Sequence, residues 1–171
     1  MKKYLKTIIG IILISIIGFL GYNITQKITY KKKVAERIKT IPVFSFLTLN
    51  NEGFTQNDLA TNKNKLFIYF NSECEYCQSE ATQISQNIEQ FIDTQIIFVS
   101  FEPIEGIKQF AENYNLYDKK DMLFLHDKKL EFSEIFDAKS IPFILLYSKD
   151  NLLIEKYKGA TKIGNILKHL N

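Results

Sequence analysis

Short apolar runs alternate along the chain with longer stretches in which apolar residues recur at helical spacing. The short runs are rich in aromatic and β-branched residues, which is typical of buried strands, and they cover residues 66–71, 95–101, 122–126 and 141–148. Two further segments beside polar turns are predicted as strands, residues 44–49 and 152–159. Spaced Ile, Leu, Phe and Ala residues predict amphipathic helices over residues 75–92, 104–114 and 130–136, and from Thr161 onward.

This order of elements predicts an α/β domain. Strands that alternate with helices form parallel βαβ units, and a closing hairpin after residue 148 adds antiparallel strands. We therefore expect a mixed sheet flanked by helices on both faces. A chain of 171 residues is long enough for one such domain and a short appendage.

The N-terminus has a different pattern. Twenty uncharged residues lie between Lys6 and Lys27, and roughly twenty residues cross a hydrocarbon core about 30 Å thick. The basic start and the apolar run resemble a secretory signal, but neither a small-x-small cleavage site nor a cysteine for lipid attachment follows. We expect an N-terminal transmembrane helix, an uncleaved signal anchor, over residues 1–27. A basic juxtamembrane linker then covers 28–41, and the folded domain covers 42–171.

Charge is distributed unevenly between these parts. Nine basic residues and one acidic residue precede Ile41, whereas thirteen basic and eighteen acidic residues make up the rest. A mildly acidic body, with its only arginine at Arg37 in the linker, excludes nucleic acid as a partner. Basic residues on both sides of the apolar run favour opposite orientations. The basic start followed by an apolar run is typical of an export signal. We therefore expect the domain on the extracytoplasmic (periplasmic) side of the cytoplasmic membrane.

The chain contains two cysteines, Cys74 and Cys77, directly after the strand predicted over residues 66–71. A structural zinc site needs four protein ligands, and the only histidines, His126 and His169, are isolated in the sequence. A disulfide between residues so close together closes a loop too small to stabilise the fold much. A redox couple explains the position, because the start of a helix favours a thiolate at Cys74. Of the three interpretations we favour the redox couple, with no metal and no cofactor.

These features resemble thioredoxin-fold proteins, and more narrowly the membrane-anchored thiol–disulfide oxidoreductases of the TlpA/ResA type. The resemblance covers the chain from about Val43 to the C-terminus. It depends on a buried strand before the CxxC motif, on Glu80 three residues after the second cysteine, and on a later strand that Ile141-Pro142 opens. A Lys-Asp-Asn turn after that strand completes the match.

The resemblance implies a role for each matching residue. Cys74 would attack a disulfide and Cys77 would resolve the mixed disulfide. Pro142 would form a cis peptide bond facing the cysteines, with Ile141 presenting its backbone to the substrate. Tyr76, between the cysteines, is expected to contact the substrate as well. Glu80 would tune the cysteines or relay protons.

The resemblance also implies partners, namely disulfides of exported proteins, including apocytochromes c, and a membrane thiol carrier that donates electrons. The sequence departs from the family at several positions. It has no tryptophan, Glu73 stands before the first cysteine, the dipeptide Glu75-Tyr76 lacks proline, and Ile68 takes the place of a buried aspartate. Acids on both sides of Cys74 oppose a stable thiolate. We therefore expect a reductant or an isomerase rather than a strong oxidant.

Two other functions compete with this prediction. A peroxiredoxin-like peroxidase has the same fold, but it needs Thr or Ser three residues before the reactive cysteine and an arginine near the thiolate. Asn71 takes that position here, and the one arginine lies in the linker. A membrane-tethered redox sensor, whose disulfide switches partner binding without turnover, stays open.

Overall fold

The computed structural model describes residues 2–170, without the side chains of residues 2, 3, 5–9 and 11–13. The chain divides into two compact units, one up to Glu36 and one from Arg37 onward. The helix α1 (Lys2–Arg37) accounts for the first unit. Among the described residues, no helix combines the length and the apolar character that are needed to cross a bilayer. The anchor predicted over residues 1–27 lies partly outside the described residues.

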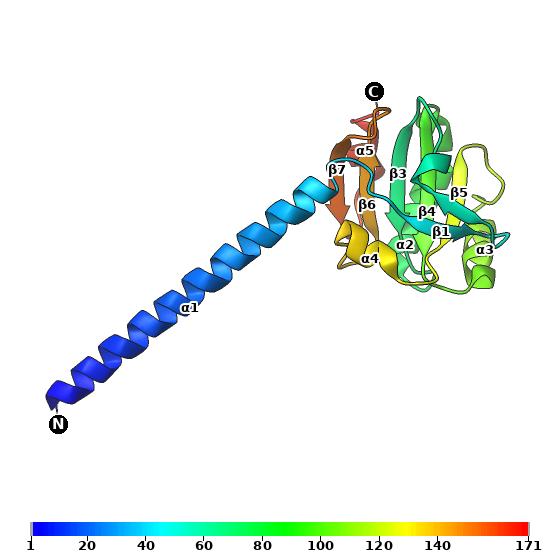
Figure 1. Ribbon diagram of the computed structural model, residues 1–171. Coiled ribbons are helices and arrows are strands. Elements are labelled where there is room, and N and C mark those ends of the chain that lie inside the picture. Colours follow the sequence, from blue (N-terminus) through cyan, green and yellow to red (C-terminus); the bar gives the residue numbers. More distant parts are fainter. Residues whose placement is uncertain (1, 171) are drawn as a thin grey trace. The chain divides into compact units, whose positions relative to one another are not determined.

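The second unit is built on one mixed sheet, which contains seven strands in the described part of the chain (Figure 1). In chain order the strands are β1 (Ser45–Thr48), β2 (Gly53–Thr55), β3 (Asn64–Tyr69), β4 (Thr94–Ser100), β5 (Met122–His126), β6 (Phe143–Tyr147) and β7 (Leu153–Lys158). Their order in space is β2-β1-β5-β4-β3-β6-β7. The central strands β3, β4 and β5 are parallel, and all other pairs are antiparallel. The predicted mixed sheet is confirmed.

Helices cover both faces of this sheet because its strands bury side chains on both sides. One face packs against α2 (Glu75–Gln86), α3 (Ile104–Asn113) and α5 (Ile163–Leu167). The other face packs against α4 (Glu131–Phe136), whose Phe132 stacks on Tyr69 with ring centroids 4.6 Å apart. Alternation along β3 separates the two cores, since Ile68 joins the α2 side and Phe67 contacts Phe136 on the α4 side.

Several boundaries differ from the prediction. The helix predicted over residues 75–92 ends at Gln86 and is followed by a short 3-10 helix, Ile88–Phe91. A second 3-10 helix, Gln56–Asp58, follows β2. Strand β2 was not predicted, because three residues are too few for a periodic pattern.

The predicted linker over residues 28–41 also differs from the structure. The helix α1 runs on to Arg37, so the first ten residues of the predicted linker are helical. The backbone N–H of Leu153 donates to the carbonyl of Lys39 at 2.8 Å, and the N–H of Ile41 donates to the carbonyl of Asn151 at 3.3 Å. Because these bonds join it to the strand β7 and the turn before it, the end of the predicted linker is part of the folded unit.

Candidate active site

The cysteine pair lies at the start of α2, after the carboxyl end of β3, and three chain segments meet at this end of the strands. Strands β3 and β4 are parallel, so their carboxyl ends reach the same edge, and the antiparallel β6 begins there. Tyr69 pairs with Val99 on one side and with Phe143 on the other. The turn after β3, the segment after β4 and the residues before β6 are therefore neighbours.

Side chains hold the turn between β3 and α2 in place. The N–H of Cys74 donates to the carbonyl of Asn71 at 3.2 Å, and the N–H of Glu73 donates to Asn71 Oδ1 at 2.9 Å. Asn suits this position because its side chain accepts a hydrogen bond from the backbone two residues further on. Gln78 Nε2 donates to the carbonyl of Ser72 at 2.9 Å. Cys74, with extended backbone angles, then becomes the residue that caps the start of α2.

The two cysteines form a dithiol with two different environments. Cys74 is half-buried, whereas the side chain of Cys77 is only 1% exposed. Burial raises the pKa of the Cys77 thiol, a hydrogen bond with Cys74 raises it further, and a backbone hydrogen bond from Asn71 partly opposes the shift. Cys77 therefore stays protonated at neutral pH, and Cys74 is the more accessible sulfur.

Glu80 lies one helical turn after Cys77, on the same side of α2. It is fully buried, so it does not lie on a solvated face of the helix. Its Oε2 accepts a hydrogen bond from the backbone N–H of Thr161 at 3.3 Å, and its Oε1 has no hydrogen-bond partner among the described residues. Burial raises the pKa of Glu80 to about 7, although the Thr161 bond opposes the shift. A carboxyl with this pKa exchanges its proton near neutral pH.

The peptide bond between Ile141 and Pro142 is cis, as the resemblance implied. The pairing of Tyr69 with Phe143 places the buried Pro142 at the end of β3, beside the start of the cysteine turn. Ile141 is half-buried and packs against the same core cluster as Cys74. These residues therefore belong to the edge of the sheet that carries the dithiol.

Tyr76, between the two cysteines, is 66% exposed. It lies in the first turn of α2, so an exposed aromatic ring stands close to both cysteines in the sequence. An exposed aromatic side chain beside a reactive group fits a role in recognition, since aromatic residues are enriched at protein interfaces.

Three residues at this edge were not singled out from the sequence: Ser72, Gln78 and Glu102. The Glu102 carboxylate accepts hydrogen bonds from the backbone N–H and the hydroxyl of Ser72, both at 2.7 Å, and from the Ser100 hydroxyl at 3.1 Å. Glu102 follows β4, which is parallel to β3, so the carboxyl ends of both strands lie at the same edge of the sheet. This rule could have placed Glu102 near the cysteine turn from the sequence.

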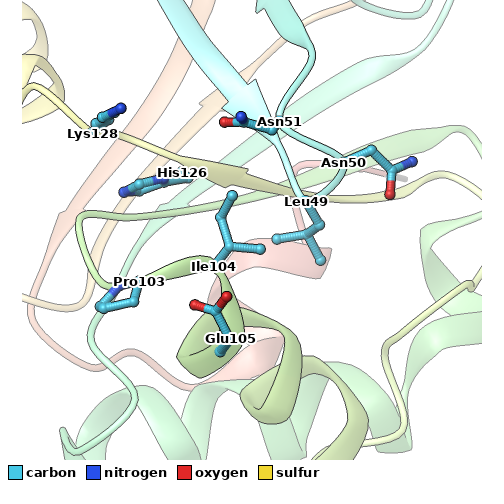
Figure 2. Close-up of a pocket in the computed structure, with 8 residues that line it drawn as sticks. All are labelled: Leu49, Asn50, Asn51, Pro103, Ile104, Glu105, His126 and Lys128. Carbon is cyan, nitrogen blue, oxygen red and sulfur yellow. The ribbon is translucent and has the colours of Figure 1, made fainter.

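A hollow of about 450 Å³ lies at the start of α3 and the end of β5. Figure 2 shows Leu49 and Ile104 close together near its centre, with Glu105 and Lys128 on different sides. His126 lines the hollow; it is half-buried, and its Nδ1 is buried without a hydrogen-bond partner among the described residues. Neither cysteine lines the hollow, so we treat it as separate from the dithiol site.

Comparisons with known proteins agree with this fold. Thioredoxin-like protein YneN of Bacillus subtilis (strain 168) is 27% identical over 121 residues, which cover 68% of this chain and 69% of that protein. A secreted Mycobacterium tuberculosis disulfide oxidoreductase homologous to E. coli DsbE superposes with a TM-score of 0.64 at 17% identity, covering 79% of this chain and 96% of that one. StoA from Bacillus subtilis superposes with a TM-score of 0.60 at 14% identity, covering 78% and 99%.

At these identities the solved structures show a shared thioredoxin-like fold. The sequence pattern of the AhpC/TSA family matches residues 39–166, which is most of the chain and includes the cysteine turn, Glu80 and the cis-proline. This protein therefore belongs to the AhpC/TSA family.

Proposed function

We propose that this protein is a thiol–disulfide oxidoreductase that reduces or exchanges disulfides in exported proteins through Cys74 and Cys77. The observation that carries the proposal is the unequal dithiol. One sulfur is accessible at the start of α2, and the other is buried behind it with a raised pKa. An accessible attacking thiol and a shielded resolving thiol are what two-step disulfide exchange requires.

In the first step, the Cys74 thiolate attacks one sulfur of the substrate disulfide. The substrate S–S bond breaks, a mixed disulfide forms with Cys74, and the released substrate thiolate takes up a proton. The N–H groups at the start of α2 favour the negative charge on the attacking sulfur. The exposed Tyr76 and the segment at Ile141-Pro142 are the surfaces that would contact the substrate chain.

In the second step, Cys77 attacks Cys74 Sγ and releases the second substrate thiol. The Cys74–Cys77 disulfide forms, and two electrons have passed to the substrate. Cys77 must lose its proton first, and its raised pKa makes this the demanding event. Glu80 is the acceptor we assign, because it is buried on the same side of α2 and its pKa is about 7. A dithiol donor then reduces the protein and completes the cycle.

The proposal includes a location and partners. The basic and apolar N-terminal sequence supports a tether in the cytoplasmic membrane, with the folded unit on the extracytoplasmic side. The donor would then be a membrane thiol carrier, and the substrates would be disulfides of exported proteins, including apocytochromes c. The resemblance to TlpA/ResA-type proteins supports this assignment.

The site is less suited to a peroxidase of the same fold. The only arginine of the chain, Arg37, donates from Nη2 to the carbonyl of Glu134 at 2.9 Å. Glu134 belongs to α4, which covers the opposite face of the sheet from α2. Asn71, three residues before Cys74, offers an amide where the peroxidase pattern has a hydroxyl.

The test is the reduction potential of the whole chain, equilibrated against glutathione or a dithiol buffer, with Cys74→Ser as the control. A potential near that of thioredoxin, about −270 mV, supports a reductase, and one near −120 mV reverses the direction. Turnover of a model disulfide protein is measured in parallel. A couple that equilibrates without turnover supports a redox sensor, and a wild type that does not equilibrate removes the proposal.

A further inference from the structure

Glu102 holds the turn that carries the attacking cysteine. Its Oε2 accepts from the backbone N–H of Ser72 at 2.7 Å, and its Oε1 accepts from the Ser72 hydroxyl at 2.7 Å. The Ser100 hydroxyl donates to the same carboxylate at 3.1 Å and accepts from the N–H of Glu102 at 3.3 Å. Both carboxylate oxygens are thus bonded to a residue that lies two positions before Cys74.

The bonds to Ser72 complete a clamp on this turn. The Ser72 carbonyl accepts from Gln78 Nε2 at 2.9 Å, so all three polar groups of Ser72 are held. One support comes from α2 and the other from the segment after β4. The dipeptide between the cysteines contains no proline that could stiffen the turn. The side chains of Glu102 and Gln78 therefore add to the bonds of Asn71 in fixing the turn.

The clamp also affects how easily the two cysteines form a disulfide. Hydrogen bonds to an ionised carboxylate are shorter and stronger than bonds between neutral groups, and both distances to Ser72 are in the short range. A disulfide forms only in a specific geometry. A turn held in one arrangement therefore lowers the cost of closing the Cys74–Cys77 bond, and it leaves the reduced form less stable relative to the oxidised form. A reduced form that is less stable is a better reductant.

We propose that Glu102 is a positioning residue for the exchange reaction, which fixes the cysteine turn through Ser72 and keeps the couple reducing. This inference rests on the proposed function, because it concerns the same dithiol. It adds Glu102, which lies thirty positions after Ser72 in the segment that follows β4, to the residues that set the properties of Cys74.

The experiment compares Glu102→Gln with Glu105→Gln in the whole chain. The second variant removes an exposed carboxylate from the first turn of α3, where it does not contact the cysteine turn. For Glu102→Gln we expect the equilibrium constant for oxidation by glutathione to fall about tenfold, which corresponds to a less negative potential by about 30 mV. Alkylation of Cys74 at pH 7 should become faster. Glu105→Gln should change neither quantity.

Ser72 variants test the same clamp with less risk to folding. Ser72→Ala removes only the hydroxyl and should shift the potential in the same direction, whereas Ser72→Thr keeps a hydroxyl and should restore it. The shifts of Glu102→Gln and Ser72→Ala should not add in the double variant, because the two residues act through one contact.

The outcomes separate this inference from the function on which it rests. If wild type equilibrates with glutathione and Glu102→Gln does not alter the potential, the positioning role is wrong and the function stands. Additive shifts in the double variant would also overturn the clamp. If wild type does not equilibrate, the function falls, and the Cys74 alkylation rates still decide whether Glu102 controls the turn.

Discussion

Cys77 and Glu80 lie one helical turn apart on α2, and both side chains are buried, 1% and 0% exposed. The negative charge of Glu80 contributes to the raised pKa of Cys77, after the larger effect of burial. A state in which Cys77 and Glu80 are both ionised is therefore less favourable than a state in which one of them keeps its proton. The pH dependence of the protein should reflect this pair.

Glu80 should make the folded protein less stable as the pH rises. Its pKa is 4.5 in an ordinary environment and about 7 in the folded protein. Between these values the folded state keeps the proton while the unfolded state has released it. The contribution of Glu80 to stability is therefore greatest below pH 4.5, and this contribution falls by roughly 1.4 kcal/mol per pH unit until about pH 7.

Glu80→Gln should remove this contribution while keeping an acceptor for the Thr161 N–H. The variant should gain stability relative to wild type between pH 5 and pH 8, measured by urea unfolding of the reduced protein. Glu75→Gln, which removes an exposed carboxylate from the same helix, is the matched control. Parallel curves for wild type and Glu80→Gln would show that Glu80 ionises normally.

The two cysteines should differ in reactivity. At pH 7, iodoacetamide should label Cys74 at least about tenfold faster than Cys77, because the thiolate is the nucleophile and Cys77 is buried with a raised pKa. Mass spectrometry of Cys74→Ser and Cys77→Ser, each with one remaining thiol, measures the two rates. Equal rates would mean that the site is open to solvent and the order of attack is unassigned.

The sequence was sufficient for most of the fold because buried strands leave a strong signal. Residues 122–126 were predicted as a strand and form β5 with the same bounds. The short strand β2 gave no such signal, and Phe54 in that strand is placed by its pairing with Phe46. The pairing of Lys39 with Leu153 was also missed, because contacts between distant segments are not encoded in local periodicity.

Only part of the site could be predicted in the same way. Cys74, Cys77 and Glu80 lie in one local motif, and spacing alone places Cys77 and Glu80 on one face of a helix. The contact between Ser72 and Glu102 joins two strand ends, and it requires knowing that β4 lies next to β3. The hydrogen bond between Glu80 and the backbone N–H of Thr161 likewise joins segments far apart in the sequence. These features require the three-dimensional arrangement of the chain.

The start of the folded unit can be tested through one buried hydroxyl. The Tyr147 hydroxyl donates to the carbonyl of Ile38 at 3.1 Å, and both residues are buried. Tyr147→Phe leaves that carbonyl without its partner, which should cost about 1–3 kcal/mol of unfolding free energy. Tyr157→Phe removes a bond to the carbonyl of Asn165 at an exposed site and should cost less than about 1 kcal/mol. Equal losses in urea unfolding would show that residue 38 is not part of the folded unit.

Tyr76 should affect substrate recognition without affecting stability. Its side chain is 66% exposed, so Tyr76→Ala should change the free energy of unfolding by no more than about 0.5 kcal/mol. Loss of an exposed aromatic contact should raise KM for a protein disulfide several-fold, because aromatic side chains supply much of the binding energy at interfaces. Reduction of 2-hydroxyethyl disulfide should be nearly unchanged, because this molecule is too small to contact much beyond the dithiol. Ile92→Ala, at an exposed apolar residue directly after the 3-10 helix Ile88–Phe91, is the control for a general surface effect. A Tyr76→Ala variant with unchanged KM for the protein substrate would place recognition elsewhere, and the segment at Ile141 would be the next surface to vary.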